Sequence, residues 1–242
     1  MSAIAVICRD DGIVIANDTI AYDDAGIVRS VSAGKVQPIL ELNCVIGNVG
    51  AGNLTAMLRA QMAQKYRDFD EVLEGIVDDF RFAYFYMVAN GTCDIGQAAT
   101  VVLCGWSAQR GRPEAYRVSV RDKEMHGPPD IGIIKVPAFT LASVGGDWCS
   151  SSYEKADRFA LGVNEETDSI KLAARYICAA RARSNIKGSG DFDGIPYYVG
   201  GEIHVTVLRD RDIRTFVAHH WPDEIGKPLD KDAGDPMPAH LL

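Results

Sequence analysis

The carboxylate of Asp18 and the ammonium group of Lys35 are the first pair in the sequence whose types and spacing could do chemistry. Two β-rich runs, residues 3–8 and 12–17, flank a turn-like sequence and predict a hairpin. In that hairpin residue i faces residue 21 minus i, so Asp18 faces Ala3. Lys35 opens the next predicted strand. A carboxylate and a desolvated pocket shift the pKa of an ammonium group in opposite directions, so this pair could hold or move a proton.

A glycine-rich stretch supplies a second chemical feature, the sequence Gly47-Asn48-Val49-Gly50-Ala51-Gly52. Asn53 follows it as the expected N-cap of a helix. Free backbone N–H groups at a helix N-terminus suit a developing oxyanion. The loop lacks the lysine and the following Ser or Thr of a phosphate-binding G-x-x-x-x-G-K-[ST] loop. The sequence therefore favours an oxyanion site over a nucleotide site.

The order of the elements predicts how these groups are positioned. After the first hairpin we expect strands at 35–42 and 44–49, helices from residue 54 and at 69–88, strands at 99–106, 114–120 and 134–144, helices at 148–161 and 168–183, and a hairpin of strands 202–208 and 213–218. Helices that come in pairs do not thread as a doubly wound parallel sheet. The order instead predicts an α+β fold, a four-layer αββα sandwich of two antiparallel sheets with a helix pair on each face. We expect residues 1–220 to form a single domain and residues 221–242, rich in Pro, Asp and Gly, to form a flexible C-terminal tail.

Charge and cysteine usage limit the partners and compartments that the sequence predicts. The formal net charge is −8 and Lys and Arg form no dense cluster, so we expect no nucleic-acid partner. No apolar run has membrane-spanning length, so we expect no membrane partner either. The chain start lacks the pattern of a secretion signal, and the six cysteines lie far apart without a C-x-x-C pair. These features predict a cytoplasmic protein with reduced core cysteines.

Three segments, AIAVICRDDGIVIANDT, SAGKVQPI and VIGNVGAGN, resemble the N-terminal third of proteasome β subunits and their bacterial relatives, which are N-terminal nucleophile hydrolases. The later helix pairs and the segment SVGGDW keep the family's order. In that family an N-terminal threonine attacks an amide, an aspartate and a lysine tune it, and a glycine-loop amide stabilises the oxyanion. The resemblance assigns these roles to Ser2, Asp18, Lys35 and the Ala51 amide. It also implies a substrate pocket lined by Ala21, Ala33, Val49 and Asn53.

The resemblance implies a self-assembling amide hydrolase that cleaves peptides or proteins without a cofactor or metal. Removal of Met1 would expose Ser2, whose hydroxyl attacks the carbonyl while its own amine takes the proton. A terminal amine with a pKa of about 7.7–8.0 is a suitable base at neutral pH. The expected partners are further copies of the chain in a ring or helical homo-oligomer, and an unfoldase.

Departures from the family's pattern keep a second hypothesis open. The nucleophile is serine instead of threonine, and the family's later supporting residues are replaced. The positions concerned are Gly146 or Asp147 for a serine, and Pro196 and Val199 for an aspartate and a serine, with Asp191 and Asp193 as displaced substitutes. The alternative is a catalytically inactive scaffold subunit that keeps the fold for assembly.

Two further patterns have simpler interpretations. The adjacent histidines His219 and His220 point to opposite faces of a strand and have no third ligand at a supporting spacing, so we expect an exposed strand end and no metal site. The aromatic stretch at residues 80–86 is apolar all round the helix. We expect it to pack on a sheet and against a neighbouring subunit.

Overall fold

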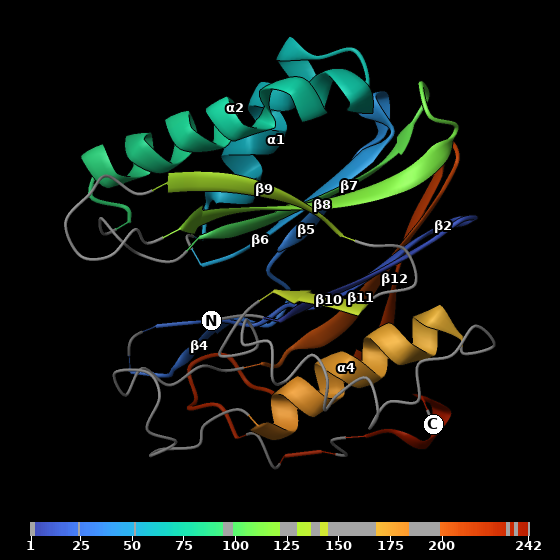
Figure 1. The fold of residues 1–242 in the computed structure, drawn as a ribbon. Helices are drawn as coiled ribbons and strands as arrows, with labels where there is room; N and C mark the ends of the chain where they lie inside the picture. Colours follow the sequence, from blue (N-terminus) through green and yellow to red (C-terminus); the bar gives the residue numbers. More distant parts are fainter. Residues whose placement is uncertain are drawn as a thin grey trace.

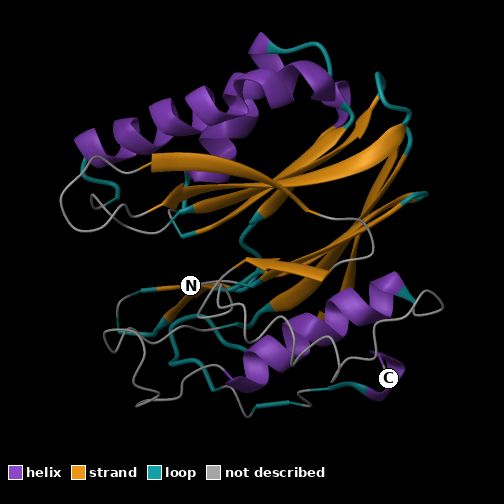
Figure 2. Ribbon diagram, in the orientation of Figure 1, coloured by secondary structure: helices purple, strands orange, loops and turns teal. Residues whose placement is uncertain are grey.

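The computed structural model describes residues 3–23, 25–50, 52–93, 99–121, 130–136, 141–144, 168–183, 199–230, 233–234 and 237–241. They form a mixed α+β fold in which two antiparallel sheets face each other and helices lie on their outer sides (Figures 1 and 2). The elements are β1 (Ile4–Arg9), β2 (Gly12–Asp18), β3 (Ala21–Tyr22), β4 (Val28–Ser30), β5 (Val36–Ile39), η1 (Leu40–Leu42), β6 (Cys44–Val49), α1 (Leu54–Lys65), α2 (Phe69–Ala89), β7 (Thr100–Ser107), β8 (Arg112–Arg121), β9 (Asp130–Val136), β10 (Leu141–Val144), α4 (Ser169–Arg183), β11 (Glu202–Arg209), β12 (Asp212–His220) and η3 (Ala239–Leu241).

The first sheet has the strand order β10-β1-β2-β11-β12, and the second has the order β5-β6-β7-β8-β9. Every pairing between neighbouring strands of these sheets is antiparallel. A short ribbon of β3 and β4 forms a separate pair. The second sheet therefore joins strands that follow one another along the chain, whereas the first joins strands from both ends of the chain.

The sequences of β1 and β2 are almost continuously apolar because both faces of these strands are covered. In β1, Ile4 and Val6 pack into the interior between the two sheets, and Ala5 and Ile7 pack against the side covered by α4. This alternation follows from the two-residue period of a strand. The hairpin that carries Asp18 is thus held on both faces.

Helices cover the outer face of each sheet (Figure 1). Helices α1 and α2 pack on the second sheet through a core that includes Leu58, Phe69 and Phe80. Helix α4 packs on the first sheet through a core that includes Leu172 and Ile177. None of the helices among the described residues is long and apolar enough to cross a membrane.

The structure confirms the α+β class with antiparallel sheets and the predicted hairpin register. The observed β1–β2 pairs run from Ile4 with Asn17 to Arg9 with Gly12, so the two residue numbers always sum to 21. The expected helix at 148–161 lies outside the described residues. The five described cysteines are buried, and none of them forms a disulfide.

Two predicted boundaries were wrong. The run 134–144 was expected to be one strand, but β9 belongs to the second sheet and β10 to the first, so the chain changes sheets within it. The strand expected at 35–42 ends at Ile39, where a turn of 3-10 helix begins. Asn43 closes that turn in the left-handed region at φ 51°.

The segment after residue 220 was expected to be a flexible tail, and in its described part Trp221, Leu229 and Leu241 are buried against the domain while most of the other residues are exposed. Trp221 is fully buried, and the guanidinium of Arg181 in α4 lies 4.7 Å from the centre of its ring. Arg181 also forms two hydrogen bonds of 2.9 Å to the carboxylate of Asp223. The abundance of Pro, Asp and Gly therefore reflects tight turns and one buried charge pair, which composition alone does not reveal.

We expect Trp221→Ala to lower the free energy of unfolding by about 3–5 kcal/mol, because it opens a large cavity beside a buried guanidinium. The matched control is Ile225→Ala, four residues further on, whose side chain is 65% exposed. The control should change the free energy of unfolding by less than about 0.5 kcal/mol. Urea unfolding followed by circular dichroism measures both. Similar small effects in the two variants would support the original prediction of a flexible C-terminal tail.

Candidate active site

Asp18 lies at the end of β2, beside the backbone of Ala3. The backbone N–H of Ala3 donates to Asp18 Oδ1 at 2.9 Å, and the N–H of Asp18 donates back to the Ala3 carbonyl at 3.3 Å. The side chain is fully buried. The hairpin therefore fixes a carboxylate next to the residue that follows Ser2.

Lys35 reaches the other oxygen of the same carboxylate. Its Nζ lies 2.7 Å from Asp18 Oδ2, and its side chain is only 11% exposed. Burial lowers the pKa of Lys35, and the charge and hydrogen bond of Asp18 oppose that shift. An ammonium group in this balance gives up its proton more readily than a lysine in water, which suits a group that relays protons.

The glycine loop approaches Lys35 through its backbone. The N–H of Asn48 donates to the Lys35 carbonyl at 3.2 Å, and the hydroxyl of Thr55 in the first turn of α1 donates to the same oxygen at 3.3 Å. The Thr55 hydroxyl also bonds to the Asn48 side chain. These contacts hold the start of α1 and the end of β6 beside Lys35, as expected from the sequence.

Ser2 and Ala51, which the resemblance assigns as nucleophile and oxyanion donor, lie outside the described residues. Gly50 before Ala51 has a φ of 102°, a conformation that favours glycine. Asn53 occupies the N-cap position of α1 as predicted, but its side chain makes no capping hydrogen bond. It is exposed, which leaves its amide available to a ligand.

The other expected pocket residues lie in different environments. Ala21 in β3 and Ala33 are half-buried, and Ala33 N–H donates to the Thr19 carbonyl at 2.7 Å. Val49 is 6% exposed and packs in the core between the sheets. Its side chain contributes to the core, and the pocket beside the β1–β2 turn and the pocket on α2 are lined by other residues.

Of the later supporting positions, Val199 is described. It is fully buried in the core beneath α4, and its carbonyl accepts a hydrogen bond from Arg181. This position therefore supplies no hydroxyl group to the site. The next residue, Gly200, contributes its backbone N–H in a long contact of 3.4 Å to Asp18 Oδ2. Gly146, Asp147, Asp191, Asp193 and Pro196 lie outside the described residues.

The deeper of the described pockets lies at the opposite end of the first hairpin from Asp18. It has a volume of about 290 Å³ and is lined by the β1–β2 turn, the end of β11 and the start of α4. Two positive residues, Arg9 and Arg209, and two negative residues, Asp11 and Asp168, line it, so its formal charges cancel. Among the described residues no group of three or more His, Cys, Asp or Glu side chains is placed to hold a metal ion.

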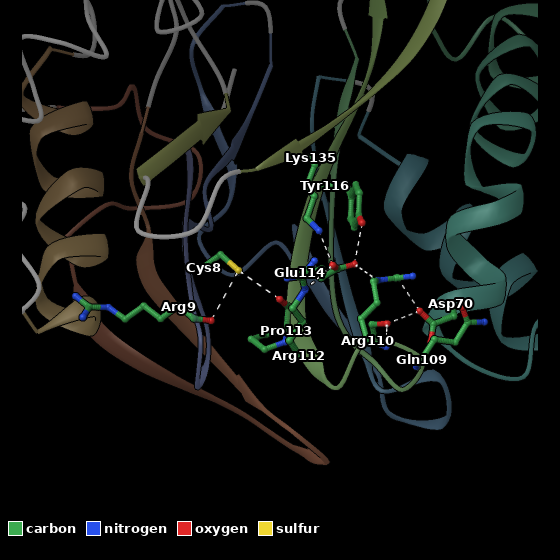
Figure 3. A network of polar contacts seen from close by, with 11 residues as sticks. Cys8, Arg9, Asp70, Gln109, Arg110, Arg112, Pro113, Glu114, Tyr116 and Lys135 are labelled. Atoms are coloured by element: carbon green, nitrogen blue, oxygen red, sulfur yellow. Dashed lines mark hydrogen bonds and ion pairs between the residues drawn. The ribbon is translucent and has the colours of Figure 1, made fainter.

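A network of charged groups that was not predicted from the sequence centres on Glu114 of β8 (Figure 3). Its buried carboxylate accepts hydrogen bonds from Arg110, Arg112, Tyr116 and Lys135. Arg110 also donates to Asp70 at the start of α2. The network connects α2 to the β7–β8 turn and to β9, so its contacts stabilise the packing of this helix on the second sheet.

Burial alone would raise the pKa of the Glu114 carboxyl group. Hydrogen bonds from Lys135, Tyr116 and Arg110 outweigh burial and lower this pKa from 4.5 to about 2. Because the folded-state pKa is the lower one, the carboxylate stabilises the fold above about pH 4.5. That stabilisation is lost as the pH falls towards 2.

Comparison of the chain with protein-family models gave no match, and comparison with curated proteins gave none either.

We expect Glu114→Gln to lower the free energy of unfolding at pH 7 by up to about 3 kcal/mol, since one pKa unit corresponds to about 1.4 kcal/mol. The difference from the wild type should shrink as the pH falls from 4.5 to 2, where the wild-type carboxylate also becomes neutral. Urea unfolding at a series of pH values measures it. The control Asp212→Asn breaks an exposed ion pair with Arg214 and should change little. A Glu114→Gln effect that is the same at pH 3 and pH 7 would contradict the assigned pKa.

Proposed function

We propose that this protein is a peptide-cleaving hydrolase of the N-terminal nucleophile class, with Ser2 as nucleophile after removal of Met1. The observation that carries the proposal is the buried Asp18–Lys35 pair, which hydrogen-bonds to the backbone of Ala3. In this proposal the complete fold is the four-layer αββα sandwich of the class, with a second helix beside α4. The buried cysteines suit a reducing compartment, so we place the protein in the cytoplasm.

The reaction would proceed by acyl transfer. The Ser2 hydroxyl oxygen attacks the peptide carbonyl carbon, and the Ser2 amine, directly or through water, takes the hydroxyl proton. The carbonyl oxygen becomes an oxyanion that the Ala51 N–H stabilises. The protonated amine then donates its proton to the leaving peptide nitrogen, which leaves an ester on Ser2. Attack of water on this ester releases the second product and restores the hydroxyl.

Lys35 and Asp18 would govern the electrostatics of these steps. The Lys35 ammonium group favours loss of the serine proton, because a nearby positive charge stabilises the alkoxide that develops. Asp18 keeps that ammonium group in place and balances its charge within a buried site. The pKa of Lys35 is lowered by burial towards that of a terminal amine, which supports a part for Lys35 in proton exchange with that amine.

The second candidate is a catalytically inactive scaffold subunit. The observation that favours it is Val199, a buried valine at the position where the resemblance places a supporting serine. In either case we propose that the chain assembles with further copies of itself. Helix α2 carries the apolar surface for that contact, with Phe82 63% and Tyr86 52% exposed and their rings stacked 6.3 Å apart.

We expect Ser2→Ala to reduce cleavage of a panel of fluorogenic peptide amides to background, because it removes the attacking oxygen. Lys35→Ala should reduce turnover by about 10²–10⁴-fold, as for other lost proton-transfer groups. Ser2→Thr should retain activity, since it keeps the hydroxyl group. Mass spectrometry checks Met1 removal in every form. Equal turnover by the wild type and Ser2→Ala would refute Ser2 catalysis, and wild-type inactivity across the panel would favour the scaffold.

We expect the protein to sediment as a homo-oligomer at micromolar concentration, and Phe82→Asp to shift it towards the single chain by placing a charge in an apolar contact. Phe216→Asp is the matched control, because Phe216 is 41% exposed on β12 and far from α2 along the chain. Analytical ultracentrifugation distinguishes the species. Sedimentation of the wild type as a single chain, or dissociation by Phe216→Asp alone, would exclude assembly through α2.

A further inference from the structure

The position of Lys35 depends on a segment without regular secondary structure. Residues 31–35, which we call the arm, connect β4 to β5 and lie in neither of the two large sheets. The β3–β4 ribbon before the arm is itself only a few residues long. The sheets therefore hold only the Lys35 end of the arm, through the hydrogen bond from Asn48 of β6 to the Lys35 carbonyl, and other contacts must hold the rest of the arm.

Thr19, the residue after Asp18, supplies those contacts. Its side-chain hydroxyl donates to the carbonyl of Val31 in the arm and accepts a hydrogen bond of 2.8 Å from the N–H of Glu202 at the start of β11. Its carbonyl accepts the N–H of Ala33 at 2.7 Å. Thr19 is fully buried. One side chain therefore joins β2, the arm and β11 at a single point.

The packing around the Thr19 hydroxyl leaves no room for a side chain at Gly201. A Cβ atom at Gly201 would lie 2.5 Å from the Val31 carbonyl oxygen and 2.8 Å from Thr19 Oγ1. Gly201 also has a φ of 76°, in the region that favours glycine. The arm and the start of β11 thus approach each other backbone to backbone, with the Thr19 hydroxyl as the polar link between them.

The far end of the arm is fixed separately. The Lys35 carbonyl accepts hydrogen bonds from Asn48 and Thr55, and the Lys35 N–H donates to the Ala33 carbonyl at 2.9 Å. Without the Thr19 hydroxyl, the arm would lose its side-chain link to β11 and would keep the backbone bond of Ala33, a hydrogen bond from Gln37 to the Gly34 carbonyl and the contacts at this end. The Lys35 side chain would then be free to leave Asp18 for water.

We propose that Thr19 is the positioning residue for Lys35: its hydroxyl fixes the arm against β11 so that the ammonium group lies on Asp18. The geometric part of this inference stands on the described contacts, and its consequence for catalysis rests on the proposed function. A hydroxyl is required because the same group must donate to Val31 and accept from Glu202. Valine has the shape of threonine but leaves both backbone groups without that partner.

The test compares Thr19→Val with Thr19→Ser, which keeps the hydroxyl, by NMR titration of the Lys35 side chain in isotopically labelled protein. Burial lowers the pKa of Lys35 more than Asp18 raises it, so release of the arm should raise this pKa towards its ordinary value. Thr19→Ser should keep the wild-type pKa. A matched control is Thr206→Val, which removes another buried hydroxyl, one that contacts Thr215 and not the arm.

An unchanged Lys35 pKa in folded Thr19→Val would overturn the proposal, as would an equal rise in Thr206→Val. If Thr19→Val does not fold, Thr19→Ala replaces it, because it also removes the side-chain hydroxyl that contacts Val31 and Glu202. Peptide turnover gives the second measurement. Misplacement of Lys35 should lower kcat about 10- to 100-fold with little change in KM, and Thr19→Ser should restore it.

The two measurements separate this proposal from the proposed function. A raised Lys35 pKa in Thr19→Val together with an inactive wild type supports the positioning role and counts against hydrolysis. Full activity in a Thr19→Val variant whose Lys35 pKa has risen overturns the catalytic consequence of the positioning.

Discussion

The burial of the Asp18–Lys35 pair is the interaction on which the candidate site depends. Two opposite charges removed from water lose several kcal/mol of hydration each, and their attraction offsets that loss only when the geometry is close and the remaining polar atoms have partners. Here the second carboxylate oxygen accepts the Ala3 N–H, and the two side chains meet at 2.7 Å. The surrounding structure therefore has to hold a β-hairpin, an arm and the start of β11 in register around one carboxylate.

The two sheets meet this requirement in different ways. The first sheet places Asp18 because β2 is a central strand, paired with β1 on one side and β11 on the other. The second sheet places Lys35 only indirectly, since β5 is its edge strand and begins one residue later. The carboxylate thus lies on a central strand, whereas the cation lies just before an edge strand and is held by Asn48 of β6, by Thr55 and by the contacts of the arm.

Much of the fold could be predicted from the period of the apolar residues and from the register of the first hairpin. Turn residues at 9–12 fix the hairpin, and counting from them places Asp18 opposite Ala3. The change of sheet between β9 and β10 was missed because residues 134–144 are apolar almost throughout, although Pro137 in that run argues against a single central strand. The role of Thr19 was not predictable, since its hydroxyl partners lie 12 and 183 residues away along the chain. Contacts of that kind depend on the tertiary fold and leave no local pattern.

The pairing of β2 with β11 also determines when the site can form during synthesis. The contact between Asp18 and Gly200 spans 182 residues, whereas the second sheet joins strands that follow one another along the chain. Domains fold as their segments leave the ribosome, and local pairings form before distant ones. The sheet from β5 to β9 and the β1–β2 hairpin can therefore form early, whereas the pairing of β2 with β11 must wait until residues 202–209 have been synthesised. In the nascent polypeptide the charged pair would stay in contact with water until then, and its burial would become complete only when β11 joins the sheet.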